Sequence, residues 1–209
     1  ECGYIHPIFE GDGPDLCECC KEPLEIALSQ LFRIQNVATK RTDKINSDEE
    51  ERLRIGYEIK TGIRFVEHSC GLSSKIALVK LNNEDIAEII YGDTTTIWRM
   101  NLGWVRRAKK DQYGFLLDVE RGYWAKNEKE GEEDDQDPMS ARVKRVIPYV
   151  EDRRNCLIYK PLKDIDKATL ISLQAALKNS IQVEYQLEES ELAAEPLPKR
   201  DDPRNILIF

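Results

Sequence analysis

Cysteines gathered near the start of the chain are the residues whose types and spacing best suit metal chemistry. Cys17 and Cys20 form a C-x-x-C pair, and a turn of this kind presents two thiolates to one zinc ion. Cys2 lies upstream as a third ligand, and Cys19 is an alternative to either member of the pair. For the fourth ligand, His6 and a cysteine upstream of the sequence both stay open. We expect structural zinc, with free thiols in a disordered terminus as the simpler alternative.

The other residues that could do chemistry are explained at least as well by structural roles as by catalytic ones. Cys156 fits a small buried residue of a strand. Cys70 follows His68 by two residues, but no third partner or oxyanion loop accompanies the pair. Neither G-x-x-x-x-G-K-[ST] nor G-x-G-x-x-G occurs, so a phosphate-binding loop is not expected. The acidic clusters at 48–51 and 134–135 suit a solvated helix start and a loop at least as well as nuclease carboxylates. We therefore predict no catalytic residue.

Basic side chains concentrate in three segments, and Trp104 lies beside the second. Phosphate groups bind such cations, and a nearby aromatic ring can stack on a base. The candidate residues for nucleic-acid contact are Arg33, Lys40, Arg41, Trp104, Arg106, Arg107, Lys109, Lys110, Arg153 and Arg154. The third segment also contains Arg142, Lys144 and Arg145. Acidic neighbours such as Glu151 and Asp152 offer ion pairs, so a solvated charged face explains these residues equally well.

Charge and hydropathy limit the possible environments of the chain. Its 209 residues are 41% hydrophobic and 33% charged, which suits a globular core with a well-solvated surface. The formal net charge of -8 argues against nucleic-acid binding by bulk charge alone. No apolar stretch reaches the roughly 18 residues of a membrane helix, and the start does not resemble a secretory signal. Because three cysteines crowd into 17–20, we expect a reducing, cytoplasmic compartment.

Strands are the main elements expected to position these residues. Alternating or continuous apolar residues predict strands in LFRIQNVA, GYEIKTGIRF (two strands with a turn at Gly62), KIALVKL, AEIIYG, TTTIWRMNLG, YGFLLDVE, RVIPYV, NCLIYKPL and NILIF. A capping-box pattern from Ser47 to Glu50 predicts a short helix. The clearest helix lies between Asp166, its N-cap, and Leu187, since apolar residues recur there at intervals of three and four.

The fold class we predict is α+β. It comprises a mixed or mainly antiparallel sheet, one long helix near the C-terminus and an N-terminal Cys-rich zinc-knuckle lobe. Residues 1–24 form this lobe and residues 25–209 an accessory domain. Residues 127–138 contain no apolar side chain and are predicted to be a mobile acidic loop.

Five stretches of the chain look like one protein family. They are LFRIQNVATKRTDKINSDEEERLRIGYEIKTGIRF, TTTIWRMNLGW, GFLLDVERGYWAKN, VIPYVEDRRNCLIY and LQAALKNSIQVEYQLEESELAAEPLP. These stretches resemble the C-terminal region of large DEAD/DEAH-type superfamily-two helicases that carry the MrfA-like zinc-binding domain. The family includes helicases of bacterial anti-phage defence, among them the DISARM type. The resemblance covers nearly all of the chain.

The resemblance implies a noncatalytic accessory module of an ATP-dependent DNA helicase or translocase whose Walker motifs lie upstream. The zinc knuckle carries over to Cys2, Cys17 and Cys20. The implied partners are DNA, the upstream helicase domains and a partner protein of a defence or repair system, and no membrane. The chain starts without Met and stops at Phe209, so we expect an excised piece of a longer protein.

Two other functions remain open at this stage. The first is a protein-interaction scaffold that recruits a methylase or nuclease without touching DNA. The second is a cryptic nuclease that uses the clustered carboxylates.

Overall fold

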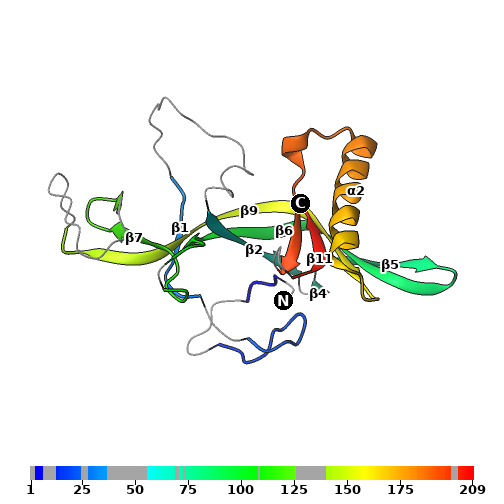
Figure 1. Cartoon of the computed structure of the whole chain (residues 1–209), viewed down its shortest axis with the longest axis horizontal. Coiled ribbons are helices and arrows are strands. Elements are labelled where there is room, and N and C mark those ends of the chain that lie inside the picture. Colours follow the sequence, from blue (N-terminus) through cyan, green and yellow to red (C-terminus); the bar gives the residue numbers. More distant parts are fainter. Residues whose placement is uncertain are drawn as a thin grey trace. The chain divides into compact units, whose positions relative to one another are not determined.

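The computed structural model consists mainly of antiparallel strands (Figure 1). It describes residues 3–6, 13–24, 28–36, 56–68, 71–72, 74–107, 109–125, 140–198 and 202–209. The strands are β1 (Leu31–Arg33), β2 (Tyr57–Phe65), β3 (Glu67–His68), β4 (Gly71–Leu72), β5 (Lys75–Leu81), β6 (Glu84–Trp104), β7 (Phe115–Asp118), β8 (Tyr123–Trp124), β9 (Val143–Pro161), β10 (Ala194–Pro198) and β11 (Pro203–Ile208). The helical elements are α2 (Lys167–Tyr185) and the 3-10 turn η1 (Glu189–Glu191).

The predicted fold class, α+β with a separate zinc-knuckle lobe, is wrong. Of the residues that the structure describes, 51% are in strands and 14% are helical, and they show no obvious zinc lobe. Backbone hydrogen bonds explain the difference. Ile63 of β2 donates to the carbonyl of Gly3 at 2.7 Å, and Ile5 donates to the carbonyl of Ile63 at 2.8 Å. The N-terminal segment is therefore attached to the sheet instead of forming a lobe of its own.

The chain divides into two compact units. Unit 1 comprises residues 1–25, 62–97 and 152–209, and unit 2 comprises residues 26–61 and 98–151. Three strands, β2, β6 and β9, contribute residues to both units. The main strand order of the sheet is β10-β11-β9-β6-β2, with β5 paired to β6 and both β1 and β7 paired to β9. The capping-box segment at 47–50 and the acidic segment at 127–138 lie outside the described residues.

Several expected strands are longer than the sequence suggested. AEIIYG and TTTIWRMNLG are parts of the single strand β6, and RVIPYV and NCLIYKPL are parts of β9. Gly62, where the sequence predicts a turn, and Gly92, between two predicted strands, serve close packing instead. A Cβ at Gly62 would lie 2.6 Å from the side chain of Ile5, and one at Gly92 would lie 2.4 Å from Thr95 Oγ1. A side chain at either position would clash with its neighbours, so glycine is needed there for packing and not for a turn. The strands therefore continue through both glycines.

The core of unit 1 lies on both faces of β11. Ile206 and Ile208 pack with Leu170 of α2, whereas Leu207 and Phe209 pack in a second cluster with Ile63, Phe65, Ile97, Cys156, Ile158 and Leu197. Ile206 and Leu207 have no exposed surface. Because successive side chains of a strand point to opposite faces, a strand covered on both sides needs an unbroken apolar run. The sequence ILIF at the C-terminus meets this need.

Helix α2 covers one face of β11 (Figure 1). Its N-cap Asp166 accepts a hydrogen bond from the Thr169 backbone at 3.0 Å, and hydrogen bonds from Thr169 lower the pKa of this carboxyl. The helix ends at Gln186, whose φ of 54° is left-handed. The predicted helix between Asp166 and Leu187 is thus confirmed, because its apolar face packs on the sheet.

Unit 2 has a smaller core of its own. Met100 and Leu102 of β6 pack against Ile147 of β9, and Tyr113 and other partly buried residues surround them. Gly114 allows the backbone of this unit to approach β9 closely. It has a φ of 81°, and a Cβ there would lie 2.2 Å from the Val146 carbonyl oxygen. Only glycine fits this position without a shift of the backbone.

Asp118 fixes the turn that joins β7 to β8. Its carboxylate accepts hydrogen bonds from the backbones of Glu120 at 3.0 Å and Arg121 at 3.1 Å, and from the backbone and hydroxyl of Ser140, each at 2.7 Å. These donors, the Ser140 backbone above all, lower the pKa of Asp118 to about 2. The charged carboxylate therefore holds both the turn before Trp124 and the start of the segment that leads into β9.

Replacing Leu170 by Ala should lower the free energy of unfolding by about 2 to 5 kcal/mol, because the side chain is only 2% exposed and leaves a cavity. Val183, 79% exposed on the same helix, provides the matched control. Val183→Ala should change stability by less than about 0.5 kcal/mol. Urea unfolding followed by circular dichroism measures both, and equal losses in the two variants would contradict the packing of α2.

Asp118→Asn should lower stability at neutral pH and flatten its dependence on pH. Since the folded pKa of about 2 lies below the ordinary 3.8, the carboxylate stabilises the fold above pH 4, and this contribution is lost as pH falls from about 4 to 2. Urea unfolding across this range is the measurement. Asp111→Asn, at an exposed carboxylate of the same unit, is the control. A wild-type slope in Asp118→Asn would refute the assignment.

Candidate nucleic-acid interface

The cysteine pair lies on a short hairpin near the N-terminus. Leu16 and Pro23 form an antiparallel bridge, and the Cys17 backbone donates to the Glu22 carbonyl at 2.8 Å. Cys17 is buried, whereas Cys20 is half-buried and Cys19 is exposed. The two members of the C-x-x-C pair are thus less accessible than the residue between them.

Both ring nitrogens of His6 are buried and make no hydrogen bond with the residues that the structure describes. Among the described residues, the Glu18 carboxylate approaches its ring, but the 3.9 Å between Nδ1 and Oε2 is too long for a hydrogen bond. A metal ligand needs an available ring nitrogen, so this environment fits a zinc ligand. Among the described residues, however, no three His, Cys, Asp or Glu side chains come together as a metal site. Cys2 lies outside the described residues, and zinc therefore stays a prediction.

The ten residues predicted to contact nucleic acid do not all belong to one unit. Lys40 and Arg41 lie outside the described residues. Arg33 of β1 lies in unit 2 and pairs with Glu151 at 3.7 Å. Arg153 and Arg154 belong to unit 1, and Arg154 pairs with Asp152 at 2.7 Å.

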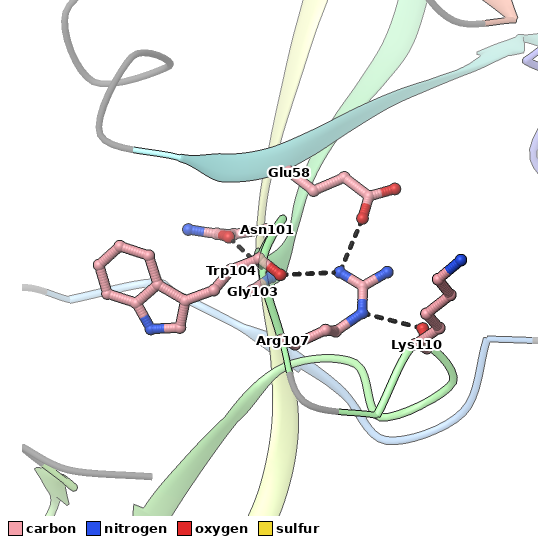
Figure 2. A network of polar contacts seen from close by, with 6 residues as sticks. All are labelled: Glu58, Asn101, Gly103, Trp104, Arg107 and Lys110. Atoms are coloured by element: carbon pink, nitrogen blue, oxygen red, sulfur yellow. Dashed lines mark hydrogen bonds and ion pairs between the residues drawn. The ribbon is translucent and has the colours of Figure 1, made fainter.

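Arg107 holds the turn after β6 together (Figure 2). Its Nη1 donates to the Glu58 carboxylate at 2.7 Å and to the Trp104 carbonyl at 3.1 Å, and its Nε donates to the Lys110 carbonyl at 2.9 Å. The guanidinium carbon also lies 4.5 Å from the centre of the Tyr113 ring. With only 12% of its side chain exposed, Arg107 is a structural residue of the turn.

The turn held by Arg107 presents three exposed cations, Arg106, Lys109 and Lys110. None of the three makes an ion pair with any residue that the structure describes. Their charge is therefore not neutralised within the described part of the chain. Phosphate groups of a ligand can bind such cations without displacing an internal partner.

Trp104 stands at the same turn and is 38% exposed. Its ring stacks on Tyr57 of β2, with centroids 4.3 Å apart and an angle of 27° between the planes. The Val105 backbone donates to the Gly56 carbonyl at 2.7 Å, so the turn is also attached to β2 by its backbone. Figure 2 shows the indole pointing away from the Arg107 guanidinium.

Further aromatic rings of unit 2 continue from this stack. Phe115 contacts both Tyr57, at a centroid distance of 5.9 Å, and Trp124, at 6.2 Å. Trp124 in turn contacts Phe32 at 6.3 Å. We call this series the aromatic path; its members are Phe32, Tyr57, Trp104, Phe115 and Trp124. Sequence reasoning found only Trp104, because the other rings come from separate strands and no short motif joins them.

Charge differs between the two units within the described residues. Unit 2 has eleven Lys and Arg side chains against five Asp and Glu, whereas unit 1 has eleven against seventeen. The described part of unit 2 is therefore net positive, although the chain as a whole is net negative. Local positive charge of this kind attracts polyanions.

Comparison with protein-family models, curated proteins and solved structures finds no match to this chain. Within the described residues, no helix has the length and apolar character needed to cross a membrane.

For the zinc prediction, we expect purified chain to contain zinc, and Cys17→Ser and His6→Ala each to lower its zinc content, because Cys17 is buried and the ring nitrogens of His6 are buried without a hydrogen-bond partner among the described residues. Cys19→Ser, at the exposed cysteine, is the matched control and should retain zinc. Metal analysis after gel filtration measures the content. Full zinc retention in His6→Ala would exclude His6 as a ligand.

Proposed function

We propose that this chain is a noncatalytic accessory module of an ATP-dependent DNA helicase or translocase, and that unit 2 engages DNA. The observation that carries the proposal is the turn after β6. Three exposed cations of this turn, Arg106, Lys109 and Lys110, make no ion pair with any described residue, and the exposed ring of Trp104 lies at the end of β6, where the turn begins. Cations bind phosphates and aromatic rings bind bases, so the two groups together suit DNA better than either alone.

The internal bonds of the turn support this proposal. Arg107 forms its hydrogen bonds inside the turn, which fixes the backbone that carries the exposed cations. A positioned cation loses less conformational entropy on binding than one on a loose loop. The charge balance of unit 2 acts in the same direction, because it favours a polyanion near this turn.

The biological setting of the proposal comes from the family resemblance. It suggests a cytoplasmic, bacterial protein of genome defence or DNA repair. The ATP-binding domains would lie upstream in the parent protein, and a partner protein of the same system is a further expectation. Zinc would be a structural cofactor.

A second candidate function, partner docking, is favoured by one observation. In the described residues β5 pairs with β6 alone, so one edge of this strand is open. Its side chains Ile76, Leu78 and Leu81 are 51 to 63% exposed. An extended segment of a partner such as a methylase or nuclease could add to an edge of this kind.

Charge reversal at Arg106, Lys109 and Lys110 should weaken DNA binding at least roughly tenfold and reduce its dependence on salt by about two to three counterions. Fluorescence polarisation with labelled DNA at several salt concentrations measures both effects. Arg107 is left unchanged, because its replacement would disturb the turn itself.

Reversal of Lys75, Lys160 and Lys163 in unit 1 is the control, since it makes the same change in net charge at exposed positions. Equal losses in both triple variants would indicate binding by overall charge only. Absence of binding at low salt would refute the proposal, and cleavage of DNA with magnesium would favour a nuclease instead.

A further inference from the structure

The aromatic path of unit 2 joins rings from five separate parts of the chain. Phe32 belongs to β1, Tyr57 to β2, Trp104 to β6, Phe115 to β7 and Trp124 to β8. Successive centroids are 4.3 to 6.3 Å apart, which is the range of direct aromatic contact. The path therefore forms one connected set of rings.

The two ends of the path are accessible. Phe32 and Trp124 at one end are 40% and 42% exposed, and Trp104 at the other is 38% exposed, whereas Tyr57 and Phe115 between them are half-buried. One face of Trp104 is covered by Tyr57, so its exposed surface lies away from that stack. Large aromatic side chains are mostly buried for their apolar area, and three exposed ones joined into one path by Tyr57 and Phe115 suit a binding surface.

We propose that the aromatic path is a base-stacking platform and that the DNA engaged by unit 2 is single-stranded; this inference rests on the proposed function. In a duplex the faces of the bases are covered by their neighbours, so an exposed ring has no base to stack on. Unpaired bases offer their faces, and stacking accepts any base sequence. Arg106, two residues after Trp104 in the chain, and Lys109 and Lys110 of the same turn then bind the phosphates of the same strand.

The rigid setting of the rings favours this role. Trp104 is held by the stack on Tyr57, and the turn before Trp124 is held by the Asp118 carboxylate. Rings that are already held in place lose little freedom when a base stacks on them. A flexible aromatic on a loose loop would lose more.

The test compares two ligands of equal length, an oligo(dT) of roughly 12 nucleotides and the same phosphodiester chain without bases. Both present phosphates, but only the first can stack. Trp104→Leu and Trp124→Leu should each weaken oligo(dT) binding by roughly 5- to 100-fold and leave binding of the base-free chain unchanged. Trp104→Phe keeps an aromatic ring and should retain most of the affinity.

Tyr185→Leu is the matched control, because Tyr185 is an exposed aromatic of unit 1, at 70% exposure. It should leave binding of both ligands unchanged. Thermal unfolding checks that each variant is folded. If the leucine variants do not fold, quenching of tryptophan fluorescence by oligo(dT), but not by the base-free chain, tests stacking in the unaltered protein.

The outcomes separate this inference from the proposed function. Equal affinity of the leucine variants and the unaltered chain for oligo(dT), or equal losses on both ligands, would overturn the stacking platform while DNA binding through the cations stands. Preference for a duplex of the same length would also overturn it. Failure to bind any DNA would refute the proposed function, and the platform with it.

Discussion

Two long strands are the constraint on which the rest of the structure depends. β6 has 21 residues and β9 has 19, several times the five or six residues of an average strand. Each strand supplies buried residues to the cores of both units, among them Ile97 and Met100 of β6. Because side chains alternate between faces, a slip of one residue would expose the core side chains of both units together.

The aromatic and basic residues of unit 2 depend on this register. β6 ends at Trp104, and the turn that follows is held by Arg107 and Glu58. Arg107 illustrates how one residue of a basic cluster differs from its neighbours. The hydrogen bonds of Arg107 lie inside the protein, so Arg107 itself is not available for a ligand. Its neighbours Arg106, Lys109 and Lys110 are exposed and make no ion pair with any described residue.

The two units also differ in their balance of charged side chains. The chain as a whole has a formal net charge of -8, yet Lys and Arg outnumber Asp and Glu in the described residues of unit 2. A surface with positive charge and exposed aromatic rings suits a polyanion with flat bases. Unit 1 contains helix α2, the larger core and strand β5, which pairs with β6 alone among the described residues.

The amino-acid sequence by itself determined the local features of this protein. The spacing of Leu170 and its apolar neighbours determined α2, and the run ILIF determined a buried final strand, because both patterns follow from the geometry of single elements. Only the tertiary structure decided that Gly62 and Gly92 lie inside long strands, since close packing by distant residues governs them. It likewise decided that the N-terminal segment joins the sheet, that Arg107 is internal while Arg106 is exposed, and that five distant aromatic rings meet. Such contacts depend on strand pairing over long separations, which no local pattern encodes.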